Sequence, residues 1–435
     1  MAATEPSSGP KRAFFDPISG GWLLVAAHFA AHADRILPAI VAPTIKARFD
    51  LSDRELGLLL GPAFVLAFVA ASLGAGAFVG WVRRYRLIAF GLVVWSLATV
   101  GFGLAQNLEQ LAAARAVLGL GQAVLAPAAL SLILQQAPPD RAGRAVAGFT
   151  SGATIGRSTA LLLAGALLTG LSLTSGLGGL STPTPAWGAL FIIGVLPNLL
   201  LAALLLRRRE PPGAPRNEAK ADGLGAWLRR TPLALGLHLT LSSAAILLTQ
   251  SVAVWAPSVF VRSAGITPGT AALWTGVVVL AAAPLGHMTG GLLVDRARKA
   301  GRPPTTPLAA VFLLVVPAAA GLGWAQGLLP LAAAYFVLTV VVGAAAVAAL
   351  AGYQPLVPPK LRGEGNAIYF AVVSLVGLGL GPPLVGAVSD RLGAGPRDLL
   401  LALAATTAAV ALPAAAASLA SAAGWMKAAS KATEQ

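Results

Sequence analysis

Apolar runs long enough to cross a lipid bilayer recur along the whole chain, and they leave few folds open to it. A transmembrane helix needs about 20 predominantly apolar residues. Since the backbone of a lipid-embedded segment must satisfy its hydrogen bonds internally, these runs predict an all-α membrane protein. Six precede one polar interruption and six follow it: Leu23–Ala42, Leu58–Val82, Leu87–Ala105, Leu111–Leu134, Ala145–Leu171, Trp187–Leu206, Leu233–Val254, Ala271–Val294, Pro307–Ala325, Leu328–Leu350, Ala367–Val388 and Leu399–Ala423.

The composition agrees with a membrane protein and excludes several kinds of site. Of the 435 residues, 57% are hydrophobic and 11% are charged, whereas soluble domains carry about 25% charged residues. Cysteine is absent, which excludes disulfides and thiolate metal sites. The sequence offers no phosphate-binding loop, no cluster of metal ligands and no nucleophile–base pairing. We therefore expect no cofactor, no metal and no enzymatic activity.

The net charge of +15 indicates topology rather than a nucleic-acid partner. If the N-terminus is cytoplasmic, most Lys and Arg residues fall in cytoplasmic connections, as the positive-inside rule requires. The opposite connections hold only Lys46, Arg48, Arg54, Arg262, Arg391 and Arg397. A charged first run after a polar tail indicates a retained helix, not a cleaved signal peptide. The short loops and high Ala and Gly content indicate a bacterial inner membrane. We expect a monomeric, multi-pass protein with both termini cytoplasmic and no nucleic-acid partner.

The polar interruption divides the chain into two halves. Its sequence, RRREPPGAPRNEAKADGLGAWLRR, is rich in Pro, Gly and charge, which is typical of a flexible linker. The predicted organisation is a cytoplasmic tail (1–18), a six-helix bundle (19–206), a cytoplasmic linker (207–230), a second six-helix bundle (231–424) and a cytoplasmic tail (425–435).

The two halves also resemble each other. GAGAFVGWVRRYR from Gly74 follows the second span, and GGLLVDRARKAGR from Gly290 follows the eighth. APPDRAGRA from Ala137 and VPPKLRGEG from Val357 follow the fourth and tenth spans at corresponding positions. With twelve spans in two repeats, the chain resembles the major facilitator superfamily. The resemblance implies two pseudo-symmetric bundles that rock about a midplane site and expose it to each side in turn.

Within that superfamily the N-terminal half is most similar to the Spinster-like transporters and related organic-anion transporters. The matching segments are the Asp34–Arg35 pair, FDLSDRELGLLL (49–60), WSLAT (95–99) and ARAVLGLGQAVLAP (114–127). Gln122 stands where Spinster-like sequences have a Glu implicated in proton coupling, and Gln cannot ionise. The loop after the second span has Gly80 in place of the acidic residue of a gating motif, while the second copy keeps it as Asp295. The gating residues implied are Gly80, Arg84, Asp295, Arg296 and Pro38.

The first span carries Asp34 and Arg35 inside an apolar run. A charge at the bilayer centre costs about 3 kcal/mol, so such residues face protein or water. Two interpretations of Asp34 remain open. It could form a structural ion pair, or it could belong to a substrate and proton site, and its position in the first span favours the second. At about 100° per residue, His28, His32 and Arg35 share one face, while Asp34 points more than a quarter-turn away. Pro38 crowds the carbonyl of residue 34 and predicts a bend there.

Buried cations outnumber buried anions in the N-terminal half. Asp34 is the one carboxylate well inside the predicted spans, against Arg35, Arg115 and Arg157. An Asp34–Arg115 pair is geometrically feasible and would leave surplus positive charge, which favours an anionic substrate. Arg157 could instead bind a carbonyl or extend toward the headgroups. We predict Asp34 as the proton-coupling group; the predicted substrate-binding residues are Arg35, Arg115, Gln122, Arg157, His32, Trp255 and Tyr369.

The C-terminal spans carry no buried charge but offer aromatic and hydroxyl side chains among aliphatic stretches. A cavity charged on one wall and apolar on the other suits an amphiphile. We therefore expect a proton-coupled secondary active transporter that moves an anionic or amphiphilic, lysolipid-type organic solute by alternating access. The alternatives are a small organic-acid or sugar-acid symporter, a multidrug exporter, and a non-transporting membrane receptor.

Overall fold

The structure is a computed structural model that describes residues 20–79, 82–137, 141–175, 186–211, 223–393 and 395–433. Over these residues the secondary structure is entirely helical, without strands. Twelve segments are long and apolar enough to cross a membrane. The predicted all-α membrane class and the number of spans are confirmed.

The described residues of the N-terminal half form ten helices, because three of its six spans are interrupted and a short helix follows the first span. Their bounds are α1 Gly21–Ile40, α2 Ala42–Phe49, α3 Asp53–Leu60, α4 Pro62–Val79, α5 Arg84–Leu104, α6 Leu108–Ala123, α7 Leu125–Gln136, α8 Ala142–Ser175, α9 Ala186–Gly194 and α10 Leu196–Leu206. The second, fourth and sixth spans are the pairs α3–α4, α6–α7 and α9–α10.

In the C-terminal half most spans are single long helices. Their bounds are α12 Pro232–Ala264, α13 Pro268–Lys299, α14 Thr305–Trp324, α15 Leu328–Tyr353, α16 Arg362–Leu392 and α17 Asp398–Ala420. Short helices flank them, namely α11 Leu224–Arg230, α18 Ala422–Thr433 and the 3₁₀ turns η1 Gln354–Leu356 and η2 Pro359–Leu361.

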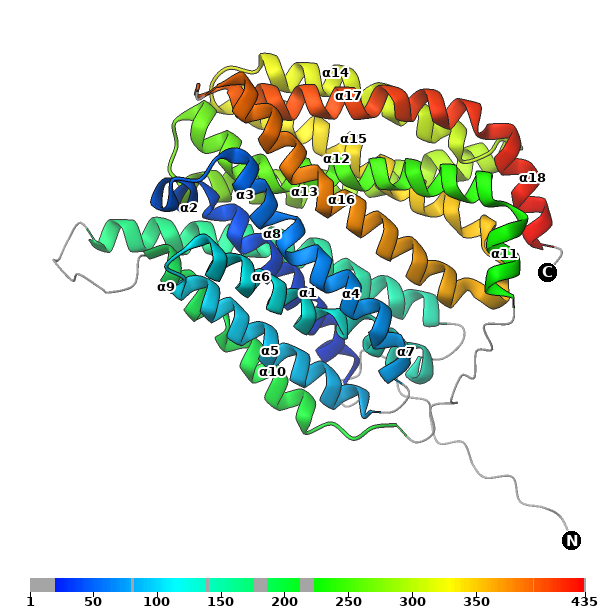
Figure 1. Ribbon diagram of the computed structural model, residues 1–435, viewed down its shortest axis with the longest axis horizontal. Coiled ribbons are helices and arrows are strands. Elements are labelled where there is room, and N and C mark those ends of the chain that lie inside the picture. The colour runs from blue at the N-terminus through cyan, green and yellow to red at the C-terminus, as the bar shows by residue number, and fades with distance from the viewer. Residues whose placement is uncertain are drawn as a thin grey trace, which may run out of the picture.

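The two halves form two bundles that lie side by side (Figure 1). The N-terminal bundle occupies the lower part of the view, and the C-terminal bundle the upper part. We call the end that carries α7, α11 and α18 the linker end, and the opposite end, with α2 and α3, the far end (Figure 1).

The second span begins five residues earlier than the apolar run suggests. Ser52 accepts a hydrogen bond from the backbone N–H of Glu55, whose side chain accepts one from the Ser52 backbone. This capping box satisfies the N–H groups that a helix start leaves unbonded. The charged residues before Leu58 therefore form the first turn of α3 rather than a loop.

Glycines bring the two bundles into backbone contact near the far end. A Cβ atom on Gly57 would lie 2.6 Å from the Pro382 carbonyl oxygen, and one on Gly386 would lie 2.2 Å from the Asp53 carbonyl oxygen. Between α8 and α13, a Cβ on Gly165 would lie 2.7 Å from the Gly269 carbonyl oxygen. Such approaches are possible because glycine has no side chain, as in close helix packing within membranes.

Both described ends of the linker are anchored. Glu210 accepts hydrogen bonds from the backbone N–H and Nε of Arg84, at 3.1 and 2.6 Å. At the other end, the Trp227 indole donates to the Leu356 carbonyl oxygen at 2.9 Å. The predicted tail 1–18 and the middle of the predicted linker lie outside the described residues. Part of the predicted C-terminal tail is helical, as α18.

Candidate functional site

Asp34 is enclosed inside the N-terminal bundle. Its side chain is buried, and Oδ2 accepts a hydrogen bond from Asn198 Nδ2 of α10 at 2.7 Å. Its neighbour Arg35 points elsewhere and donates from Nε to Gln122 Oε1 of α6 at 2.6 Å. The prediction that adjacent Asp34 and Arg35 do not pair with each other is therefore confirmed. Helix α1 continues through Pro38 and ends two residues later, at Ile40.

The prediction of an ion pair between Asp34 and Arg115 is wrong. Among the described residues Asp34 has no ion pair, and Arg115 donates from Nη2 to the Leu60 carbonyl oxygen at 3.0 Å. That carbonyl is available because the span breaks at Gly61. The Phe64 N–H, which would bond Leu60 in a continuous helix, bonds the Gly61 carbonyl instead. Arg115 thus satisfies a backbone group that the helix break frees.

Arg115 still has donors to offer. Its Nε and Nη1 atoms are buried and have no hydrogen-bond partner within the described structure. The guanidinium carbons of Arg115 and Arg35 lie 5.1 and 4.8 Å from the centroid of the same ring, Phe64. Arg35 also lies 4.7 Å from the Phe68 centroid. Cation–π contacts of this kind stabilise a desolvated guanidinium by about 0.5–2 kcal/mol, without neutralising it.

Gln122 orients Arg35. It accepts from Arg35 through Oε1 and donates from Nε2 to the Ala31 carbonyl oxygen at 3.1 Å. Both ends of the amide are therefore used, which fixes its orientation. Because Gln is neutral, Arg35 keeps its full positive charge.

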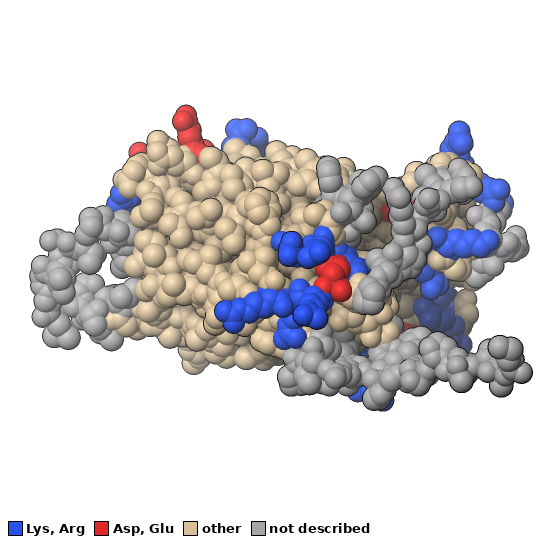
Figure 2. All heavy atoms as spheres, turned by 90° about the horizontal axis from the view of Figure 1, so that it is seen from below, with Lys and Arg blue, Asp and Glu red and all other residues tan. Residues whose placement is uncertain are grey.

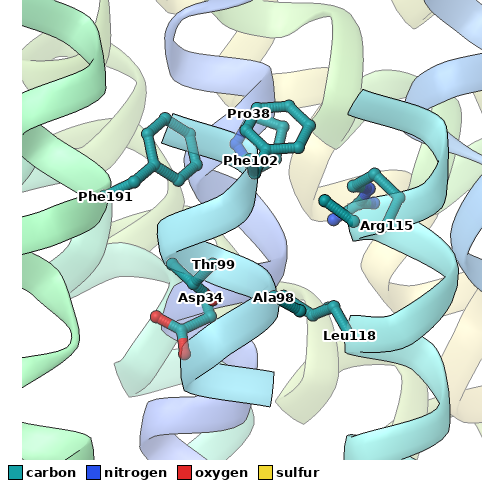
Figure 3. A pocket seen from close by; sticks show the side chains of 9 residues that line it. Asp34, Pro38, Ala98, Thr99, Phe102, Arg115, Leu118 and Phe191 are labelled. Atoms are coloured by element: carbon teal, nitrogen blue, oxygen red, sulfur yellow. The ribbon is translucent and has the colours of Figure 1, made fainter. Parts of the chain in front are cut away.

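A small cavity joins the surroundings of Asp34 and Arg115. It has a volume of about 10 Å³, close to the space that one water molecule needs. Figure 3 shows Asp34 and Arg115 on different helices at opposite sides of this lining, with the Asp34 carboxylate turned away from Arg115. Its lining is otherwise apolar apart from Thr99. Asp34 and Arg115 are therefore the two charged groups that line one small, mostly apolar cavity.

Arg157 and the histidines lie nearby. No hydrogen bond or ion pair engages Arg157 in the part of the chain that the structure describes. It lies within electrostatic range of Arg35 and of Tyr335 in the other bundle. His28 Nδ1 contacts the Phe149 carbonyl oxygen at 2.8 Å, and His32 Nδ1 contacts the His28 carbonyl oxygen at 3.1 Å. The two imidazoles are thus already bonded to backbone.

The two predicted C-terminal residues, Trp255 and Tyr369, have partners other than the arginines. Trp255 is fully buried, and its indole donates to the Pro382 carbonyl oxygen at 3.0 Å. Tyr369 is also buried, and its ring packs 4.6 Å from that of Tyr353 toward the linker end. Neither side chain is brought together with the arginines. A substrate role for Trp255 or Tyr369 stays a prediction.

The predicted gating residues have different surroundings. Gly80 lies outside the described residues. Arg84 is buried and bonds Glu210 at the start of the linker and Ser131 and Gln135 of α7. Asp295 and Arg296 are exposed in the last turn of α13. Their gating roles, like that of Pro38, stay predictions.

Sequence reasoning missed two important residues. Asn198 is the donor to Asp34, and its only signal was an amide inside the apolar run FIIGVLPNLLLAALLL. Asp53 had no signal beyond its place in the segment FDLSDRELGLLL. It is buried, with Lys46 Nζ 2.6 Å from Oδ1 and Arg262 Nη1 of the other bundle 2.6 Å from Oδ2.

The chain is similar in sequence to known membrane transport proteins. It is 26% identical to an MFS-type efflux pump of Mycolicibacterium smegmatis, over 88% of this chain and 86% of that protein. It is 30% identical to the cis,cis-muconate transport protein of Acinetobacter baylyi over 41% of this chain and 40% of that one.

The fold has a close structural counterpart. A crystal structure of a bacterial homologue of the human lysosomal transporter Spinster, inward-facing and unoccupied, superposes with a TM-score of 0.80. Identity to it is 21%, and 98% of each chain is covered. Residues 24–382 match the family profile described as Major Facilitator Superfamily. With its twelve spans in two bundles and this match over most of its length, the chain belongs to the major facilitator superfamily.

Proposed function

We propose that this chain is a proton-coupled secondary transporter that moves an organic anion or anionic amphiphile by alternating access. One observation carries the proposal: the three guanidinium groups inside the N-terminal bundle, those of Arg35, Arg115 and Arg157, have no carboxylate partner among the described residues. Arg35 is held by a neutral amide, and Arg115 by a carbonyl oxygen with two buried nitrogens left over.

The physical argument rests on the cost of buried charge. A cation taken out of water is costly unless it gains an opposite charge or several hydrogen bonds. A carboxylate or phosphate would supply both, since the planar guanidinium binds such groups through two parallel hydrogen bonds. The unused Nε and Nη1 of Arg115 can each donate a hydrogen bond to an anionic oxygen, and Arg157 can add a third positive charge.

Asp34 is the group we assign to proton coupling. An ionised Asp34 accepts from Asn198, whereas a protonated one can donate to the Asn198 amide oxygen, so either state keeps a partner. Across the small cavity, an ionised carboxylate attracts the Arg115 guanidinium and competes with an anionic solute for it. Proton binding would therefore favour anion binding at the same site.

Alternating access is supported by the contacts at the far end. Asp53 and Arg54 donate their backbone N–H groups to Asp390 at 2.9 Å, and Asp53 also pairs with Arg262. These contacts join the two bundles, and their exchange for contacts at the linker end would reorient the site.

Figure 2 shows most of the visible Lys and Arg side chains between the middle of the molecule and the linker end. We infer that the linker end and both termini are cytoplasmic, in a bacterial inner membrane, and that one chain, which carries both bundles, acts as a monomer.

Two solute classes fit the same cationic site. The muconate transport protein is a relative, and muconate is a dicarboxylate. A Spinster-like amphiphile would need an apolar surface for its tail, and the C-terminal bundle offers one. The efflux pump to which the chain is similar suggests export as the alternative direction, which would require proton and anion to exclude each other. A cationic drug is disfavoured because it would meet surplus arginine.

Uptake into proteoliposomes tests the proposal. The panel comprises a six-carbon dicarboxylate, a sugar acid and an anionic lysophospholipid, each with and without a proton gradient. We expect gradient-dependent accumulation of one anion class, a loss of about tenfold or more in Arg115→Lys, and no change in the exposed control Arg302→Lys. Asp34→Asn should abolish gradient-driven accumulation while anion binding persists. Accumulation of cations only, or an Asp34→Asn variant that still responds to the gradient, would refute it.

A further inference from the structure

A groove lies at the linker end of the C-terminal bundle, away from the arginine site. It has a volume of about 290 Å³ and lies between the start of α12 and the junction of α17 with α18. Its lining combines two cations, Arg230 and Lys427, with apolar residues, the most exposed of which is Leu233 at 74%. No carboxylate of the described residues lines it. From this combination we infer that the groove binds the phosphate headgroup of an anionic phospholipid, with one acyl chain on Leu233 and Leu237.

Packing of α18 against the rest of the C-terminal half fixes the position of Lys427 relative to Arg230. In α18 the Trp425 indole donates to the Gly352 carbonyl oxygen at 3.0 Å. Trp425 and Ala428 are buried against Leu356, and Ala234 of α12 packs on the same cluster. Helix α18 is therefore held beside the start of α12, which places Lys427 opposite Arg230 across the groove.

The backbone at this place adds to the positive potential. Thr231 precedes α12 without a side-chain cap. The first-turn N–H groups of Leu233 and Ala234, which line the groove, therefore have no side-chain cap. The positive end of the helix dipole reinforces the two side-chain charges. Together they complement a phosphate diester.

The apolar part of the lining distinguishes a lipid from a free anion. Leu233 is exposed in the first turn of a membrane span, and the proposed site places it where headgroups give way to acyl chains. Basic pockets between transmembrane helices at this depth are suited to anionic lipid headgroups. A soluble anion would gain nothing from Leu233 and Leu237.

Native mass spectrometry of the full-length protein in detergent tests the inference. The probes are phosphatidylglycerol, phosphatidylcholine with the same acyl chains, and inorganic phosphate. Wild type should retain phosphatidylglycerol at least about tenfold better than phosphatidylcholine, since each basic residue near a lipid headgroup contributes about fivefold. The double variant Arg230→Gln, Lys427→Gln should lose that preference. A matched double variant at the same end, Arg298→Gln with Lys299→Gln, should keep it.

Three outcomes would overturn the inference. They are an unchanged preference in the Arg230, Lys427 variant, equal retention of the two lipids by wild type, and displacement of phosphatidylglycerol by millimolar inorganic phosphate. Because the readout is retained lipid rather than transport, its failure leaves the proposed solute site untouched. The single variant Leu233→Ser supplies a second test, because it should weaken retention of both lipids without abolishing the preference.

Discussion

Asp53 of one bundle and Arg262 of the other form an ion pair, with Nη1 of the guanidinium 2.6 Å from Oδ2 of the carboxylate. The same oxygen accepts from Ser389 Oγ, also at 2.6 Å. The Asp53 side chain is only 3% exposed. A buried carboxylate shared by residues of both halves ties the bundles together at the far end, and any reorientation must break it.

Arg262→Gln should weaken the contact between the two bundles at the far end. Asp53 keeps Lys46 and Ser389, so the loss is one hydrogen bond to a charged group, about 1.5–3 kcal/mol, enough to shift a two-state equilibrium about tenfold or more. The chain has no cysteine, so spin labels at Glu109→Cys and Gln326→Cys, both exposed near the far end, can report the distance between the bundles. We expect a larger population of long distances than in wild type. The surface variant Arg48→Gln should leave the distribution unchanged; the same shift in both variants would show that the pair does not hold the far end closed.

How far the sequence could predict this arrangement differs from residue to residue. The twelve spans followed from apolar length alone, because lipid leaves few other options for the backbone. The divergence of Asp34 and Arg35 followed from 100° of rotation per residue. Asn198 could not be assigned to Asp34 in this way, because their contact joins residues 164 positions apart.

Arg115 shows why the predicted ion pair failed. Its partner is the Leu60 carbonyl oxygen, which is free only because the second span breaks at Gly61. Helical periodicity places side chains on faces, but it does not reveal which backbone groups a break will release. Arg115 therefore donates to a backbone carbonyl oxygen and not to the Asp34 carboxylate.

Gln122→Glu should neutralise Arg35. The new carboxylate would occupy the position of an amide oxygen that already lies 2.6 Å from Arg35 Nε. An internal ion pair would then compete with the solute for the guanidinium, and anion affinity should fall by about tenfold, or about 1.4 kcal/mol. Equilibrium binding of the transported anion measures this directly. Gln326→Glu, on the surface, is the matched control; undiminished affinity in Gln122→Glu would argue that Arg35 does not bind the solute.

Asn198→Ala should destabilise the protein through Asp34. It removes the amide donor that lies 2.7 Å from the buried carboxyl group, which costs about 1–3 kcal/mol. In an Asp34→Asn background the same substitution should cost less, because an amide oxygen is easier to leave unpaired than a carboxylate. A double-mutant cycle on thermal unfolding in detergent measures the coupling between the two positions. Additive effects would mean that the 2.7 Å contact contributes nothing specific.

Gly386→Ala should hinder closure at the far end without disturbing the rest of the fold. The added Cβ would lie 2.2 Å from the Asp53 carbonyl oxygen of the other bundle, a backbone atom that cannot rotate away. Overpacking of this kind typically costs about 1–3 kcal/mol. The cost falls on the far-end-closed state alone, since the clash disappears when the bundles separate there. The spin-label pair should therefore report the same direction of change as in Arg262→Gln. Gly291→Ala, where nothing lies within 4 Å of the new Cβ, should behave as wild type. If Gly386→Ala lowered the unfolding temperature while the distance distribution stayed as in wild type, the glycine would serve packing alone and not the contact between the bundles.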